Sequence, residues 1–187
     1  MKLNHNNIIL LLALFLIPNA KSAEIISLYQ GTLSRTIKVE ELNEFQKTKV
    51  PSTKLKNILN ITNQKENDLL KVLSYEIEVP LKASSKLMKS KIGEVFLKRL
   101  GKIIYPNKIS DKNIGVKAIR SGIILSSYNN NQRINLIDFF KAYPNKNVAI
   151  NLSALRKTLK KAESLKELIE FYSNSPFKKL KDGSSSI

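Results

Sequence analysis

Very few side chains in this chain could carry out acid–base or metal chemistry. The only histidine is His5, and there is no cysteine. A serine nucleophile usually needs a histidine base, and zinc or copper usually needs histidine or cysteine ligands. No serine stands in a G-x-S-x-G sequence. A serine–lysine pair is the remaining option, formed by Ser90 with Lys91 or by Ser85 with Lys89. Because lysine is abundant, we interpret both pairs as coincidences.

Carboxylates form two groups that could supply an acid and a base. Such pairs hydrolyse glycosidic bonds in many enzymes. The groups are Glu40, Glu41 and Glu44, and Glu66, Asp68, Glu76 and Glu78. Each residue also suits the first turn or the solvated face of a helix, where a negative charge is favourable. The chain has no D-x-[DN]-x-[DN]-G calcium loop and no glycine-rich phosphate loop. We therefore expect no metal, no cofactor and no enzymatic activity.

Residues 1–22 have the features of a secretory signal peptide. A positively charged start precedes the unbroken apolar run Ile8–Ile17. Ala20 and Ser22 are small residues suited to cleavage before Ala23. The apolar run is about half the roughly 20 residues that a membrane span requires. We predict cleavage, which would remove His5 and leave the mature protein outside the cytoplasm.

The chain is strongly basic, with a formal net charge of +17 and a pI of about 10.0. Such a charge is typical of proteins that bind nucleic acid, anionic membranes or acidic polymers. Most of the 32 basic residues are lysines, whereas groups that read bases or grip phosphates favour arginine. We therefore expect no nucleic-acid partner, and an AT-rich coding bias is one explanation of the lysines.

The basic residues are densest between Lys82 and Arg120, where the only acidic residues are Glu94 and Asp111. The lysines either coat the solvated faces of amphipathic helices or form a docking patch. Such a patch would face an anionic lipid surface or a negatively charged partner protein. The candidate docking residues are Lys82, Lys86, Lys89, Lys91, Lys98, Arg99, Lys102, Lys117 and Arg120.

The elements that would position these residues are mostly helical. β-branched and aromatic residues on both sides of Gly31 predict a β-hairpin over residues 24–39. Beyond it, apolar residues recur at steps of three and four, which predicts six to eight helices. Expected spans are 39–45, 55–61, 64–79, 81–90, 92–104, 111–127, 134–143 and 154–172.

Three details of these elements follow from local signals. Asn63 is predicted to cap the third helix, with Glu66 as its partner, and Pro80 to end it. The helix over 92–104 is predicted to carry Val95, Phe96, Leu100, Ile103 and Ile104 on one side. A short extended stretch over 148–152 is capped by Asn151 or Ser153.

The predicted fold is therefore mainly α: one helical domain over residues 23–173, with a short N-terminal β-hairpin packed on it. A basic and then serine-rich tail follows over residues 174–187.

Four stretches of the chain resemble a cyanobacterial domain of unknown function that usually stands ahead of an α/β-hydrolase catalytic domain. They are AEIISLYQGTLSRTIKVEELNEF (23–45), IGEVFLKRLGKII (92–104), NIGVKAIRSGIILSSYN (113–129) and INLIDFFKAYPNKNVAINL (134–152). Residues that match the family pattern include Gly93, Glu94, Arg99, Leu100, Gly101 and Asn151.

The resemblance implies an accessory domain in the periplasm or the thylakoid lumen. In the family, the hydrolase domain would begin after the last helix, where this chain reaches Ile187, so no catalytic residue can be carried over. We expect a non-catalytic module that docks to a separately encoded hydrolase or to an anionic membrane surface. The alternatives are an enzyme of the α/β-hydrolase family and a carrier of a small apolar ligand.

Overall fold

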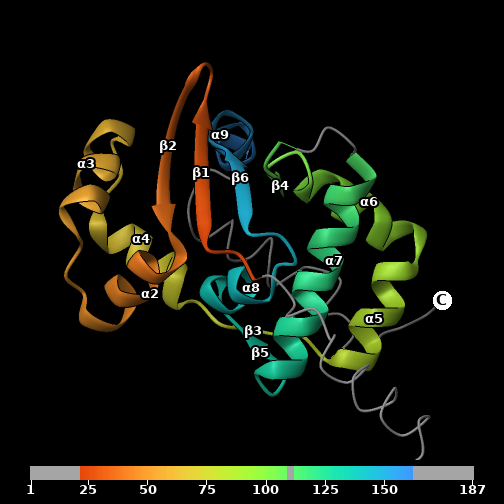
Figure 1. The fold of residues 1–187 in the computed structure, drawn as a ribbon. Coiled ribbons are helices and arrows are strands. Elements are labelled where there is room, and N and C mark those ends of the chain that lie inside the picture. Colours follow the sequence, from red (N-terminus) through yellow and green to blue (C-terminus); the bar gives the residue numbers. More distant parts are fainter. Residues whose placement is uncertain (1–21, 109–111, 162–187) are drawn as a thin grey trace, which may run out of the picture.

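The computed structural model describes residues 22–108 and 112–161 (Figure 1). His5, residues 1–21 of the predicted leader, the end of the predicted last helix and the tail over 174–187 lie outside this range. The predicted hairpin is confirmed: β1 (Ile25–Gln30) and β2 (Leu33–Lys38) pair antiparallel around a turn in which Gly31 has a φ of 61°.

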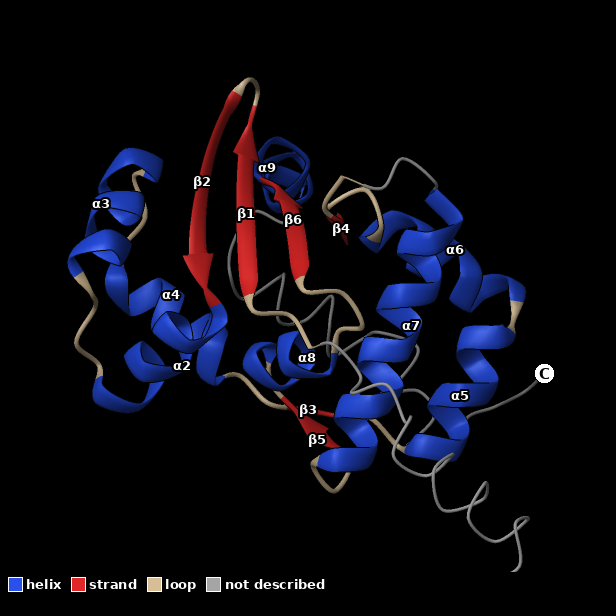
Figure 2. Cartoon of the chain, viewed as in Figure 1, coloured by secondary structure: helices blue, strands red, loops and turns tan. Residues whose placement is uncertain are grey.

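The predicted fold class is wrong, because the hairpin belongs to a larger mixed sheet. β6 (Asn147–Asn151) pairs parallel with β1, and β4 (Ile104–Pro106) pairs antiparallel with β6. The strand order is β2-β1-β6-β4. The chain is therefore an α/β mixed fold rather than a helical domain with an attached hairpin (Figure 2).

The parallel pair joins the two ends of the described chain. Ile26 lies opposite Ile37 of β2 and Val148 of β6, and all three are almost fully buried on one face of the sheet. The main-chain N–H of Glu24 donates to the carbonyl of Lys146, and the Lys146 ammonium lies 3.0 Å from the Glu24 carboxylate. A parallel pair requires a crossover, and here nearly the whole domain forms it.

Three helices lie beyond β2 in Figure 1: α2 (Val39–Thr48), α3 (Thr53–Thr62) and α4 (Glu66–Ser74). Asn63 is not the N-cap of α4. It adopts the left-handed conformation (φ 53°) at the C-terminus of α3, a position that asparagine tolerates. The predicted helix also ends early, at Ser74. Ile77–Glu78 forms β3, which pairs with β5 (Arg133–Ile134).

Three further helices lie on the β4 side of the sheet (Figure 1): α5 (Leu81–Lys89), α6 (Lys91–Leu100) and α7 (Lys112–Asn129). The helix predicted over 92–104 stops four residues early, because Gly101 caps α6 and Ile104 enters β4. All three helices pack on one another, and α7 also packs on β4.

The last two helices complete the core. α8 (Leu136–Ala142) begins at Asn135, whose side chain accepts a hydrogen bond from the Asp138 N–H while Asp138 caps the Asn135 N–H in return. α8 packs against α2, α4 and α7, so it joins the two helical groups, and its Phe140 is almost fully buried. α9 (Leu152–Lys161) packs against β1 and β6, and Asn151 caps it as predicted.

Candidate functional site

Eight of the nine predicted docking residues lie on α5, α6 and α7, and Lys102 lies in the turn that follows α6. On α5, Lys82, Lys86 and Lys89 follow each other at steps of four and three residues and are all exposed. This spacing places them on one face of the helix. The α5 lysines therefore form a continuous positive stripe.

The basic residues of α6 and α7 are less uniform. Lys91, Lys98, Arg99 and Lys117 are exposed, as is Lys102 in the turn after α6, whereas Arg120 is half-buried. The Lys98 ammonium lies 2.7 Å from the Glu94 carboxylate. The hydrogen bond and charge of Lys98, with the charge of Arg120, hold the pKa of Glu94 below its usual value. Lys98 is therefore paired with a carboxylate, whereas the other eight cations of the patch make no ion pair with any described residue.

Exposed apolar residues stand among these cations, and sequence reasoning missed them. Ile92 is 69% exposed and Val95 is 51% exposed. The sequence places Val95 on the same side of the helix as Phe96 and Leu100, but Val95 is exposed and Leu97 is the fully buried residue of α6. Ile92, Val95 and Arg99 stand at steps of three and four residues, so one helix face combines two apolar side chains with a cation. The spacing of these three residues in the sequence was the signal that could have revealed this mixed apolar and basic face.

The residues that match the family pattern have structural positions. Gly93 is buried where α6 meets the end of α5, and its N–H donates to the hydroxyl of Ser90, the N-cap of α6. Gly101 caps the other end of α6, and Leu100 is half-buried. Glu94 and Arg99 are exposed, and Asn151 caps α9. The conformation of α6 and the start of α9 account for most of this pattern.

The candidate catalytic groups also have local partners. The Ser90 hydroxyl donates to the Leu87 carbonyl at 2.6 Å while it caps α6. Glu41 accepts hydrogen bonds from the Lys38 N–H and the Ser52 hydroxyl. A hydrogen bond from Asn43 is the main cause that lowers the pKa of Glu40. Within residues 22–108 and 112–161, no three acidic or histidine side chains gather where they could hold a metal ion.

One polar network links distant strands across the sheet. The Tyr29 hydroxyl donates to the Asn107 side-chain oxygen at 2.9 Å, and the Asn107 amide donates to Ser27 at 3.2 Å. Burial, and then the nearby Tyr29, raises the pKa of Tyr105. These contacts tie β1 to the segment that follows β4, and we assign them a structural role.

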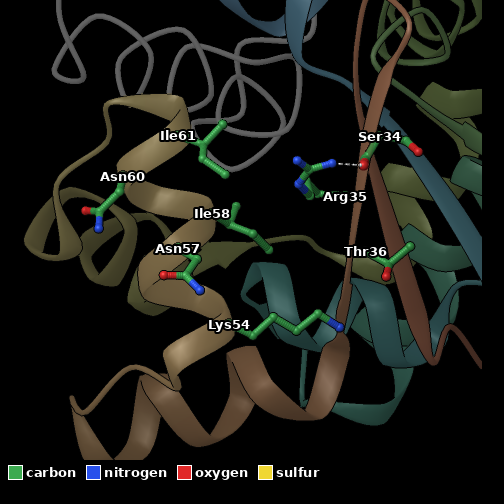
Figure 3. Close-up of a pocket in the computed structure, with 8 residues that line it drawn as sticks. All are labelled: Ser34, Arg35, Thr36, Lys54, Asn57, Ile58, Asn60 and Ile61. Carbon is green, nitrogen blue, oxygen red and sulfur yellow. Dashed lines mark hydrogen bonds between the residues drawn. The ribbon is translucent and has the colours of Figure 1, made fainter.

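An open cleft lies between β2 and α3, far along the chain from the basic patch. Its volume is about 660 Å³, and it is lined by Ser34, Arg35, Thr36, Lys54, Asn57, Ile58, Asn60 and Ile61. Figure 3 shows Arg35 pointing from β2 toward α3 and Lys54 pointing from α3 toward β2. Arg35 and Lys54 are the two charged residues that line the cleft, so each wall carries one cation.

None of the helices in the described part of the chain combines the length and the hydropathy needed to cross a bilayer.

Comparison with known proteins identifies the family. A family model described as an alpha/beta hydrolase of unknown function (DUF1400) matches residues 22–151. A search of curated proteins and a search of solved structures each found no match. The match covers the sheet, the helices up to α8 and the cap of α9, and it confirms the resemblance read from the sequence. The chain belongs to the family of alpha/beta hydrolases of unknown function.

Proposed function

We propose that the chain is an exported, non-enzymatic module that docks on anionic membrane surfaces through α5 and α6. The observation that carries this proposal is the exposure of Ile92 and Val95 beside Lys91, Lys98 and Arg99. Apolar side chains surrounded by cations are typical of helices that lie in the membrane interface. The proposed export rests on the apolar run Ile8–Ile17 and the small residues before Ala23.

The charge of the surface is adequate for such docking. Each lysine or arginine near an anionic leaflet contributes about 1 kcal/mol. The three lysines of α5 and the cations of α6 would together give weak, reversible binding. The contribution from Ile92 and Val95 would come from burial of their side chains below the headgroups.

The non-enzymatic part of the proposal is supported by the local engagement of the candidate catalytic groups. Ser90 caps α6, and Glu40 and Glu41 accept hydrogen bonds within and around α2. In assays on esterase and glycosidase substrates, we expect the protein to give background rates. Turnover abolished by Ser90→Ala or Ser85→Ala would contradict this part of the proposal.

Sedimentation with vesicles tests the docking. We expect the protein to bind phosphatidylglycerol vesicles at low salt, to leave them at high salt, and to ignore phosphatidylcholine vesicles. Changing Lys82, Lys86 and Lys89 together to glutamine should weaken binding. The matched control changes Lys56, Lys71 and Lys157, which are exposed on α3, α4 and α9, and removes the same charge. Equal loss in the two triple variants would show a general charge effect and contradict docking through α5.

A further inference from the structure

We propose that the cleft between β2 and α3 binds an extended, acidic segment of a partner protein, which would add a fifth strand to the sheet beside β2. This inference concerns a different surface from the proposed membrane contact and does not depend on it. It rests on the free edge of β2, on the shape of the cleft and on the charge of its walls.

β2 is an edge strand whose outer side lacks a neighbouring strand in the described chain. A two-residue hairpin turn places Gln30 and Leu33 in a hydrogen-bonded pair, and pairs alternate along an antiparallel ladder. Ser34 and Thr36 therefore direct their main-chain N–H and C=O groups away from β1. The Ser34 carbonyl accepts a hydrogen bond from the Arg35 guanidinium at 2.9 Å, which agrees with this orientation.

The outward-facing main-chain groups at the two ends of the β2 edge differ in whether they already have a hydrogen-bond partner. The N–H of Lys38 is capped by the Glu41 carboxylate at 3.3 Å, at the start of α2. The N–H and C=O of Thr36 have no such partner among the described residues. An incoming strand would find the edge open at Thr36 and at the Ser34 N–H, with the Ser34 carbonyl already bonded to Arg35 and the Lys38 N–H closed by Glu41. Strand addition to such an edge is a general mode of peptide recognition.

The cleft provides the room for that strand. Its volume of about 660 Å³ lies along Ser34, Arg35 and Thr36, with α3 as the opposite wall (Figure 3). Asn57 and Asn60 of α3 line it with amide groups that can bond to a polar segment. Because α3 already stands on one side, a peptide would be held by main-chain bonds to β2 and by side-chain contacts with α3.

The charges on the walls select an acidic occupant. Arg35 is exposed, makes no ion pair in the described chain and points across the cleft. Lys54 lies 3.8 Å from Glu41, a carboxylate already shared with Ser52 and Lys38. No acidic side chain is among the described residues that line the cleft. A carboxylate is the group that an arginine fork binds best.

An apolar hollow beside the cleft adds a second requirement on the sequence of the bound segment. Leu28, Leu33, Ile58, Ile61 and Leu152 line it together with Arg35. Leu33 is 62% exposed and Ile61 is 59% exposed, so an apolar side chain would bury both. Leu33 and Arg35 are two residues apart and lie on the same face of β2. The segment should therefore carry an apolar residue and an acidic residue at positions i and i+2.

A second copy of this chain is a poorer occupant. Pairing β2 with the β2 of another copy would bring two Arg35 residues into one interface, and each copy carries a formal charge of +17. Like charges that face each other across strands are destabilising. Light scattering should show a monomer, and a dimer that Thr36→Pro dissociates would overturn the proposal in favour of self-association.

A designed peptide tests the proposal. The probe is a fluorescein-labelled eight-residue peptide with threonine at alternate positions and a leucine two residues from a glutamate. By fluorescence anisotropy, Arg35→Gln should bind it about tenfold more weakly than the wild type. The matched control is Arg133→Gln, which removes an exposed arginine from β5 and should leave affinity unchanged.

Two changes in the peptide separate strand addition from simple charge attraction. Replacing its glutamate by glutamine should weaken binding to the wild type and have little further effect on Arg35→Gln, since the two changes remove the same contact. Methylating the alternate main-chain nitrogens that face β2 should abolish binding. Equal affinity of the methylated peptide would overturn the proposal.

NMR locates the contact. The amide signals of Ser34 and Thr36 should shift on peptide addition and become protected from exchange. Shifts confined to α5 and α6, or no binding by the wild type at about 1 mM peptide, would overturn the proposal. Retained peptide binding by the triple glutamine variant of α5 would show that this site is separate from the membrane surface.

Discussion

Gly93 on α6 lies so close to the end of α5 that a β-carbon at this position would be 2.1 Å from the carbonyl oxygen of Leu87. The obstacle is main chain, with the Met88 α-carbon also only 2.7 Å away, so no side chain can move aside. The close approach sets the corner between the two helices that carry the proposed membrane contact. A residue that matches the family pattern thus has a steric reason to be glycine.

Gly93→Ala should lower the free energy of unfolding by about 2–3 kcal/mol, because the added methyl must push the α5 main chain away. Urea unfolding followed by circular dichroism measures the change. Gly115→Ala is the control. Its added methyl would meet Pro106 and Tyr105 at ordinary distances of 3.6 and 3.7 Å, and alanine favours the helix by about 1 kcal/mol. A larger loss in Gly115→Ala would contradict the steric explanation.

Ser127→Ala should destabilise the protein by about 1–3 kcal/mol. The buried Ser127 hydroxyl donates to the Val79 carbonyl at 2.6 Å, which ties α7 to the segment before α5. Its loss leaves that buried carbonyl without this donor. The neighbouring Ser126 is also buried, but it donates at 3.2 Å to Ile123 within its own helix. Ser126→Ala should cost less, and the reverse order in urea unfolding would refute the assigned role.

Tyr143→Phe should preserve or raise stability, by up to about 1 kcal/mol at neutral pH. Tyr143 is fully buried, and its hydroxyl has no hydrogen-bond partner among the described residues. Its ring packs against Phe139 with centroids 5.6 Å apart, a contact that phenylalanine keeps. A loss above 1 kcal/mol would show that the hydroxyl has a partner.

Tyr143→Phe should also change how the free energy of unfolding depends on pH in alkaline solution. Burial raises the pKa of Tyr143 well above its usual value. The folded state therefore keeps the phenol neutral, while the unfolded chain ionises near pH 10, so this group's contribution to stability is lost as the pH rises above 10. At pH 11 the wild type should lose about 1.4 kcal/mol relative to Tyr143→Phe. A difference that does not change between pH 8 and pH 11 would contradict the burial of this phenol.

Val95→Ser should weaken binding to phosphatidylglycerol vesicles without lowering the unfolding midpoint. Val95 is 51% exposed, so serine removes little packing but deletes an apolar side chain from the proposed membrane contact. Val50→Ser is the control, since Val50 is 68% exposed and precedes α3. Equal vesicle binding by the two variants would exclude insertion of the Val95 side chain.

Local signals in the sequence predicted many of the elements. Gly31 marks the hairpin turn and Asn151 caps α9, as predicted. Each feature depends on residues close in sequence, which makes it readable from a single chain. The candidate docking residues are exposed on α5, α6 and α7 and in the turn after α6, except for half-buried Arg120, and their docking role stays a prediction.

Apart from the cap assigned to Asn63, the predictions that failed depended on distant partners. Ile77 and Ile104 continue helical apolar patterns, yet each enters a strand because Ile134 and Ile150 lie opposite them. Apolar spacing cannot distinguish a short buried strand from the end of a helix. The apolar spacing also groups Val95 with Phe96 and Leu100, and only the packed neighbours decide that Val95 itself stays exposed.

The sequence by itself determined the positions of most helices, the hairpin, the charge and the scarcity of catalytic side chains. Only the tertiary structure decided that β1 pairs with β6. This pairing makes the fold a mixed sheet with helices rather than the predicted helical domain with a hairpin. The tertiary structure also left the outer edge of β2 open beside α3, with Arg35 and Lys54 on facing walls. Turns and caps are satisfied within a few residues, whereas strand pairing and clefts arise from contacts between segments that only folding brings together.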